Sequence, residues 1–172
     1  MKIRPATFSD IPAITRIYAH AVEHGTASFE LEPPDEAEMA RRMRELTGKG
    51  FPYLAADADG ELAGYAYAGL YRARPAYRFT VEDSVYIAPH SHRRGVGRAL
   101  LAALIDACSE RGFRQMIAVI GDSPRQAGSV GLHKALGFQH VGILQDVGFK
   151  HEHWCDSLLM QRALGPGGTT KP

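Results

Sequence analysis

Residues 80–101 read TVEDSVYIAPHSHRRGVGRALL, and this stretch decides the fold. Its first part, rich in β-branched and aromatic residues, predicts a strand over 79–87. Period-two geometry places Glu82 on one face of that strand and Asp83 on the other. An apolar stripe at helical spacing then predicts a helix over 96–110. The chain is therefore expected to pass directly from a strand into a helix.

The turn between this strand and this helix has features of an anion site. Gly95 and Gly97 let the backbone approach a ligand without an intervening Cβ atom. The helix start presents unpaired N–H groups and the positive end of its dipole, which suit a diphosphate. The turn is neither a Walker A loop nor a three-glycine dinucleotide fingerprint. On these residues alone, a tight turn with solvated Arg93 and Arg94 is an equal alternative.

The flanking sequence predicts one α/β domain over residues 1–163, followed by a flexible tail over 164–172. Asp10 or Ser9 is expected to cap the first helix, and Asp35 the second. The expected strands start at Ile3 and lie over 53–56, 62–70, 79–87, 115–120, 140–143 and 154–161, with helices over about 11–24, 36–47, 96–110 and 129–136. This order predicts a mixed, mostly antiparallel sheet of about seven strands flanked by about four helices, with one parallel crossover.

Composition limits the classes of partner. Twenty Lys and Arg residues against nineteen Asp and Glu residues give a net charge of +1, so no global field favours nucleic acid or a membrane surface. No apolar run reaches the length of a membrane span, and the first residues lack a signal-peptide core. Cys108 and Cys155 lack the spacing of a disulfide framework, which favours reduced thiols in a cytoplasmic protein.

Two motifs add a family resemblance. The glycine turn His92-Arg93-Arg94-Gly95-Val96-Gly97, together with Leu136-Gly137-Phe138 after a short helix, resembles the GNAT superfamily of N-acetyltransferases over residues 1–163. His92 replaces the residue that usually begins that motif. The resemblance implies a GNAT fold, with a V-shaped splay between the fourth and fifth strands, and acetyl-CoA as co-substrate.

The same resemblance implies where acetyl-CoA binds. It assigns the pyrophosphate to Arg93, Arg94, Gly95, Val96, Gly97 and Arg98, and the pantetheine arm to Val85, Tyr86 and Ile87. Gln126 stands near the position where relatives carry an asparagine that contacts coenzyme A. It is expected to substitute for that asparagine.

Five spaced blocks give a closer resemblance. Residues 73–77, 80–86, 118–121, 133–138 and 147–151 with Trp154 are similar to phosphinothricin and methionine sulfoximine N-acetyltransferases. The resemblance implies acetylation of the α-amino group of a small amino-acid analogue, and a homodimer. Acetylation of a peptide or protein N-terminus and a non-catalytic acetyl-CoA sensor are the alternative functions.

Glu82 and His133 are the catalytic candidates. An amine attacks a thioester only when it is neutral, so a proton acceptor is needed near the amine and a proton donor near the departing thiolate. Glu82, on the strand that the resemblance assigns to the cofactor arm, suits the first task, because burial would raise its pKa. His133 occupies the position where many GNAT members carry a thiolate-protonating tyrosine. A surface ion pair for Glu82 and a structural hydrogen bond for His133 are the plainer interpretations.

Arg72, Arg74, Tyr77 and Phe29 are the candidates for acceptor binding. A substrate with a carboxylate and a second oxyanion favours guanidinium partners, which bind both oxygens at once. The resemblance places recognition at Arg72 and Arg74, with Tyr77 close behind and Phe29 as a wall. A solvated loop is the alternative for the two arginines.

No metal site is expected. His151 and His153 alternate along the chain and would face the same way on a strand, but the sequence offers no matched third ligand. Turn or subunit-interface histidines are the preferred interpretation.

Overall fold

A single seven-stranded sheet organises the protein, whose 172 residues are all described by a computed structural model. The strands are β1 (Lys2–Pro5), β2 (Tyr53–Ala58), β3 (Glu61–Leu70), β4 (Thr80–Ile87), β5 (Gln115–Gly121), β6 (Gln139–Lys150) and β7 (His153–Ala163). They lie in the order β1-β2-β3-β4-β5-β7-β6, and every neighbouring pair is antiparallel except β4 and β5. The predicted mixed sheet with one parallel crossover is confirmed.

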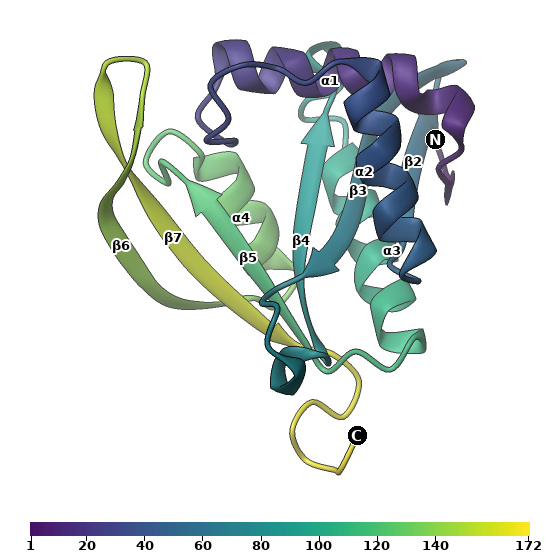
Figure 1. The fold of residues 1–172 in the computed structure, drawn as a ribbon, viewed down its shortest axis with the longest axis vertical. Coiled ribbons are helices and arrows are strands. Elements are labelled where there is room, and N and C mark those ends of the chain that lie inside the picture. The colour runs from purple at the N-terminus through teal and green to yellow at the C-terminus, as the bar shows by residue number, and fades with distance from the viewer.

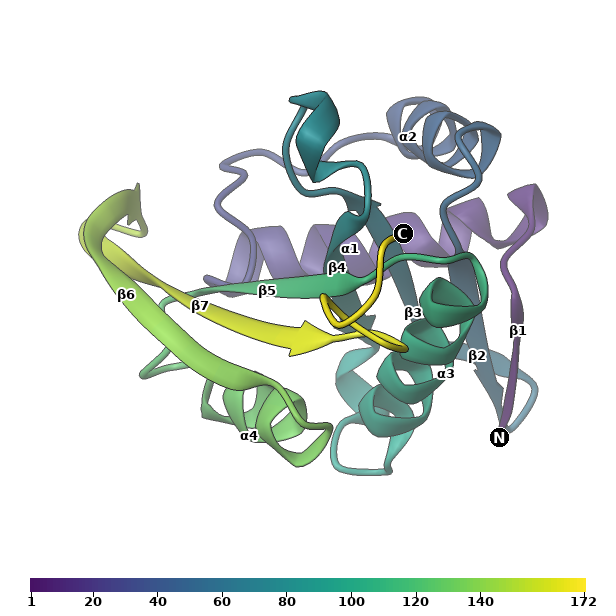
Figure 2. The ribbon, with the colours of Figure 1, turned by 90° about the horizontal axis from the view of Figure 1, so that it is seen from below.

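Two pairs of helices cover the two faces of the sheet (Figures 1 and 2). The pairs are α1 (Ile11–His24) with α2 (Glu36–Gly48), and α3 (Val96–Glu110) with α4 (Ala127–Ala135). The apolar stripes of α1 and α2 bury Ile14 and Met43 against a layer of tyrosines on β2 and β3. Leu100 and Leu104 of α3 pack on Met116 of β5 in the larger core. None of these helices is both long and apolar enough to cross a lipid bilayer.

The helix starts agree with the sequence in one case and differ in the other. Asp35 caps α2 as predicted, because its carboxylate accepts a hydrogen bond from Glu38 N at 2.8 Å. α1 begins after Asp10, but the Asp10 side chain does not cap it. This carboxylate instead accepts from Thr7 N at 2.7 Å and pairs with Arg4 at 2.8 Å. A 3-10 turn over Phe8–Asp10 precedes the helix and moves the cap back to Thr7.

The last hairpin is longer than the sequence pattern predicted. β6 and β7 run for 12 and 11 residues, whereas only 140–143 and 154–161 were expected as strands. Register shifts between His140 and Gly142 and between Leu144 and Gly148 interrupt the period of two and hide the strand pattern. The tail prediction also begins one residue too early, since Leu164 is 1% exposed and belongs to the core.

β4 and β5 diverge along their length. Their paired residues are Thr80 with Gln115, Val81 with Met116 and Glu82 with Ile117, and no pairing follows beyond Glu82. The later residues of both strands therefore face each other without a shared hydrogen-bond ladder. This confirms the expected V-shaped splay.

Candidate active site

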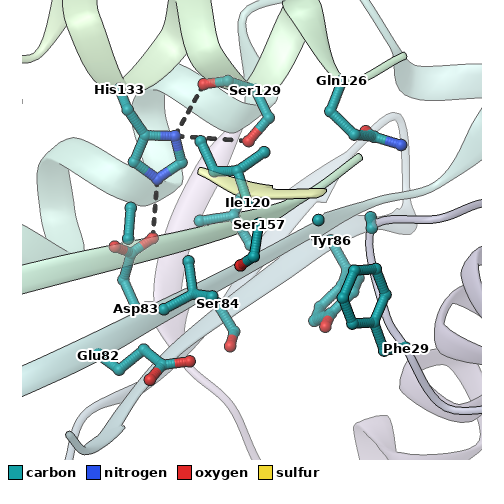
Figure 3. A pocket seen from close by; sticks show the side chains of 15 residues that line it. Phe29, Glu82, Asp83, Ser84, Tyr86, Ile120, Gln126, Ser129, His133 and Ser157 are labelled. Carbon is teal, nitrogen blue, oxygen red and sulfur yellow. Dashed lines mark hydrogen bonds and ion pairs between the residues drawn. The ribbon is translucent and has the colours of Figure 1, made fainter. Parts of the chain in front are cut away.

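A cavity of about 250 Å³ lies in the splay between β4 and β5 (Figure 3). α4 and the loop between α1 and α2 complete its walls. Its lining consists of Ala27, Phe29, Glu82, Asp83, Ser84, Val85, Tyr86, Ala118, Val119, Ile120, Gly121, Gln126, Ser129, His133 and Ser157. The predicted residues Phe29, Glu82, Val85, Tyr86, Gln126 and His133 are thus brought together.

Glu82 projects from the face of β4 that α1 and α2 cover. Gly69 lies opposite it on β3, and a Cβ atom at Gly69 would have only the Leu46 side chain within 4 Å, at 3.4 Å. Space therefore remains beside the carboxylate. Burial raises the pKa of Glu82, and the charge of Asp83 adds to this rise while Arg72 opposes it. A carboxylate with a raised pKa is suited to accept a proton near neutral pH.

His133 is bound through both ring nitrogens. Its Nε2 lies 2.9 Å from Asp83 Oδ2, and its Nδ1 lies 2.8 Å from the Ser129 carbonyl oxygen. His133 is 4% exposed and Asp83 is 7% exposed. Burial alone would lower the pKa of His133, but the hydrogen bond and charge of Asp83 outweigh it, so the pKa is raised.

Phe29 forms a wall because two glycines make room for its ring. A Cβ atom at Gly121 would lie 2.7 Å from Phe29 Cε1, and one at Gly148 would lie 2.5 Å from Phe29 Cε2. The loop that carries Phe29 is anchored by Lys150, whose ammonium donates to the Ser28 carbonyl at 2.7 Å. The end of β6 thus positions a cavity residue from the other end of the chain.

The predicted pyrophosphate turn has an irregular backbone. Arg93 has a φ of 60° and Gly95 a φ of 80°, and α3 starts directly after Gly95. Arg93 and Arg98 are exposed, and Arg94 pairs with Asp59 at 2.6 Å. Successive N–H groups before an open helix start form a concavity that suits an anion.

Not every predicted cofactor residue faces the cavity. Val96 is buried beneath the turn. The Ile87 side chain reaches the positions where Cβ atoms of Gly64 and Gly97 would lie. Both side chains therefore support the turn from the core side, and any contact of these two residues with a ligand would come from their main chain.

The predicted acceptor residues after β3 lie outside the cavity lining. The Arg72 guanidinium lies 5.1 Å from the centre of the Tyr71 ring, and Tyr77 meets the same ring edge-on at 5.7 Å. Arg74 and Tyr77 are exposed. Arg72 is near enough to lower the pKa of Glu82, so this segment borders the Glu82 side of the site. Acceptor binding by Arg72, Arg74 and Tyr77 stays a prediction.

The model of a family described as an acetyltransferase (GNAT) domain matches residues 3–159. The chain belongs to the GNAT acetyltransferase family. The family resemblance is thereby confirmed, and the protein is an acetyl-CoA-dependent acyltransferase.

Individual relatives agree with this assignment. The acetyltransferase is 55% identical over 170 residues to phosphinothricin N-acetyltransferase of Alcaligenes faecalis, covering 99% of this chain and 86% of that protein. It is 39% identical over 165 residues to the L-methionine sulfoximine/L-methionine sulfone acetyltransferase of Pseudomonas paraeruginosa, covering 95% of each. A crystal structure of a phosphinothricin acetyltransferase from Sinorhizobium meliloti in complex with AcCoA superposes with a TM-score of 0.96 at 49% identity, covering 99% and 92% of the two chains.

The splay of this GNAT acetyltransferase fits an extended thioester arm. Beyond Glu82, β4 pairs only with β3, so the edge that faces β5 keeps free main-chain groups along Ser84–Tyr86. An extended chain can hydrogen-bond to such an edge as an added strand would. Val85, Tyr86 and Gln126 line this space, and Gln126 lies at the start of α4. Their contact with acetyl-CoA stays a prediction.

Sequence reasoning missed Asp83 and Ser129. Asp83 was placed on the face away from Glu82, which is correct, but its partner His133 lies 50 residues later and carried no local signal. Ser129 precedes His133 by four residues, a spacing that brings side chains together on a helix and would have indicated the contact.

One further cluster combines metal-ligand residue types. Asp122, His153 and Cys155 each bring a ligand atom within 4.8 Å of the others. Arg125 lies against the same groups, with Nη1 3.2 Å from Asp122 Oδ2 and in contact with His153. A guanidinium here competes with a metal ion for the carboxylate. The prediction that the acetyltransferase needs no metal stays a prediction.

Proposed function

We propose that the protein transfers acetyl from acetyl-CoA to the α-amino group of a small amino-acid analogue, by direct attack in a ternary complex. Phosphinothricin, methionine sulfoximine and methionine sulfone are the proposed acceptors, because relatives with those names match nearly the whole chain. One observation carries the catalytic part of this proposal. Glu82, with its raised pKa, shares a cavity with the buried Asp83–His133 pair.

The acceptor enters as an ammonium ion, so its nitrogen must lose two protons and the sulfur must gain one. Glu82 removes the first proton, directly or through water, and the neutral nitrogen attacks the thioester carbonyl. The second proton leaves the nitrogen to solvent as the C–N bond forms. Main-chain N–H groups near Tyr86 and Ile87 stabilise the developing oxyanion. As the new C–N bond forms and the C–S bond breaks, the sulfur leaves with the electron pair and takes a proton from the His133 side.

The positive charges at the two ends of the site support the proposed binding of both substrates. The pyrophosphate of acetyl-CoA is proposed to bind the main-chain N–H groups and guanidinium groups of the turn over 93–98, with the pantetheine along β4 and Gln126. The acceptor's carboxylate and second oxyanion are proposed to bind Arg72 and Arg74, with Tyr77 and Phe29 as walls.

A homodimer is proposed on the basis of the β6–β7 hairpin. Six large apolar side chains on this hairpin are 48–62% exposed: Val141, Ile143, Leu144, Val147, Phe149 and Trp154. Several large exposed apolar side chains on one hairpin are typical of protein–protein interfaces. Light scattering on a size-exclusion column tests the dimer, and Val147→Asp is expected to give monomers.

The proposed location is the cytoplasm, where the buried, unpaired Cys108 and Cys155 would stay reduced.

Release of free thiol from acetyl-CoA tests the activity. A panel of the three analogues, ordinary amino acids, polyamines and peptides is offered at equal concentration, and product masses identify the acetylated amine. Turnover restricted to the analogues supports the proposal. Turnover with peptides or polyamines alone contradicts the acceptor assignment, and acetyl-CoA binding without turnover of any amine favours a sensor.

A further inference from the structure

The two hydrogen bonds of His133 define where its protons are. The Ser129 carbonyl can only accept, so Nδ1, at 2.8 Å, must carry a hydrogen. Nε2 lies 2.9 Å from the Asp83 carboxylate, which also accepts when ionised. The ring therefore donates from both nitrogens and carries a positive charge opposite Asp83. Neither nitrogen is free to reach a substrate sulfur directly.

Ser129 connects this buried charge to the cavity. Its hydroxyl oxygen lies 3.4 Å from His133 Nδ1, while the residue also lines the cavity in the splay. Figure 3 shows Ser129 and Asp83 on opposite sides of the His133 ring. A chain of contacts therefore runs from Asp83 through His133 to Ser129.

We propose that Ser129 is the catalytic residue that protonates the departing thiolate, that His133 resupplies its proton, and that Asp83 is a positioning residue for His133. This inference rests on the proposed acetyl transfer and assigns the proton path on its leaving-group side. It needs no group beyond the two substrates, the three side chains and solvent.

The atoms balance in this step. When the C–S bond breaks, its electron pair stays on sulfur, and the Ser129 hydroxyl gives its proton to that sulfur. The Ser129 oxygen takes the Nδ1 proton of His133, whose contact with the Ser129 carbonyl opens as the proton moves. His133 becomes neutral while Nε2–H still donates to Asp83. The proton that Glu82 took from the amine returns to solvent, and solvent recharges His133.

The same geometry excludes Ser129 as a nucleophile. In a Ser-His-Asp hydrolase, the histidine nitrogen that faces the serine must be unprotonated to act as a base. Here that nitrogen is Nδ1, which carries a hydrogen bonded to a carbonyl. The arrangement can deliver a proton to Ser129 but cannot take one from it. Asp83, His133 and Ser129 are therefore arranged for acid catalysis and not for nucleophilic attack.

The residues around Asp83 and His133 favour a pair that gains and loses protons as one unit. Phe138 covers the His133 ring edge-on at 4.9 Å, and Cys108 of α3 approaches Asp83. Burial raises the pKa of the Cys108 thiol to about 12, so it stays neutral over the working range. Glu82, on the opposite strand face, is a second acid close enough to interact with Asp83. Asp83 Oδ1 is buried without a hydrogen-bond partner, so the positive His133 is what offsets the carboxylate's charge.

Kinetics of single variants test the role of Ser129. Ser129→Ala is expected to lower kcat about 10- to 100-fold and leave the KM for acetyl-CoA unchanged, because a general acid acts only in the transition state. Ser129→Thr restores a hydroxyl and is expected to recover most of kcat. Ser123→Ala, in the loop before α4, is the matched control and should retain the wild-type kcat. Equal kcat in Ser129→Ala and wild type would overturn the assignment.

The pH dependence tests Asp83. In wild type, kcat is expected to fall at high pH as His133 loses its proton. Asp83→Asn removes the charge that holds this proton, so the falling limb should move to lower pH. If Asp83 had only a structural role, Asp83→Asn would lower the thermal stability but leave the falling limb of the pH profile of kcat at its wild-type position. Asp83→Glu, which keeps the charge, is expected to keep the limb near its wild-type position.

A spectroscopic measurement distinguishes a failure of the proposed proton path from a failure of the proposed acceptor assignment. Nitrogen NMR of the labelled imidazole in the free protein should show His133 doubly protonated at neutral pH, and neutral in Asp83→Asn. A neutral ring in wild type would overturn the proton path, whatever the acceptor. If the panel shows turnover only with amines other than the three analogues, the acceptor proposal fails, but the Ser129 and Asp83 variants are compared on an accepted amine with the same expected effects.

Discussion

Glu82 and Asp83 are adjacent on β4, but their carboxylates lie on opposite faces of the sheet in different surroundings. Glu82 lies on the face covered by α1 and α2, and burial raises its pKa. Asp83 lies on the face covered by α3 and α4, is more deeply buried, and is hydrogen-bonded to His133. Burial acts against a charge on Glu82, whereas the buried charge of Asp83 has a cationic partner. One strand thus carries the proposed proton acceptor on one face and the partner of His133 on the other.

The largest effect expected from this comparison is loss of turnover at Glu82. Glu82→Gln keeps the shape of the side chain but cannot accept the amine proton, so kcat is expected to fall about 10²- to 10⁴-fold. Acetyl-CoA affinity, measured by calorimetry, should stay within about twofold. If Glu82→Gln kept more than half of the wild-type kcat, the assignment of proton acceptance to the Glu82 face of β4 would be wrong.

Asp83 is expected to dominate stability instead. Asp83→Asn should lower the free energy of unfolding by about 1–3 kcal/mol at pH 6, because His133 loses its charged partner. His133 has a raised pKa in the folded state, so its contribution is full below its ordinary value of 6.5 and is lost as the pH rises through the folded value. Urea unfolding from pH 5.5 to 9 should show this decline in wild type and not in the variant. An equal decline in both proteins would contradict the pairing.

Gly148→Ala tests the wall on the Glu82 face. The new Cβ atom would lie 2.5 Å from Phe29 Cε2, so the ring must move away. The KM for the acceptor is expected to rise severalfold with that for acetyl-CoA unchanged, and stability to fall by about 1 kcal/mol. Gly142→Ala on the same strand is the matched control, since nothing lies within 4 Å of its Cβ position. An equal KM for the acceptor in Gly148→Ala and Gly142→Ala would show that Phe29 does not contribute to acceptor binding.

The smallest effect should appear in the stability of Glu82→Gln. Because burial raises the pKa of Glu82, its ionised form opposes folding at neutral pH. The neutral glutamine is expected to raise the free energy of unfolding by about 0.5–1 kcal/mol at pH 8, less than the worth of one pKa unit. The gain should vanish near pH 4, where Glu82 holds its proton in both states. Destabilisation at pH 8 would mean that the Glu82 carboxylate has a partner that stabilises its charge.

Most of the framework follows from local patterns. The strand over 80–87, the helix after Gly95 and the opposite facing of Glu82 and Asp83 all come from the spacing of side chains along the chain. The long β6–β7 hairpin was harder to predict, because its bulges break the period of two and much of β6 is exposed.

The sequence by itself determined the order of elements, the glycine turn before α3 and the faces of β4, because each depends on neighbours a few residues apart. Only the tertiary structure decided that Asp83 meets His133, 50 residues away, and that Phe29 fits against Gly121 and Gly148. Such contacts depend on how α4 and β6 pack on the splayed sheet. Packing distances are set by the whole core and leave no periodic signal in the residues that meet.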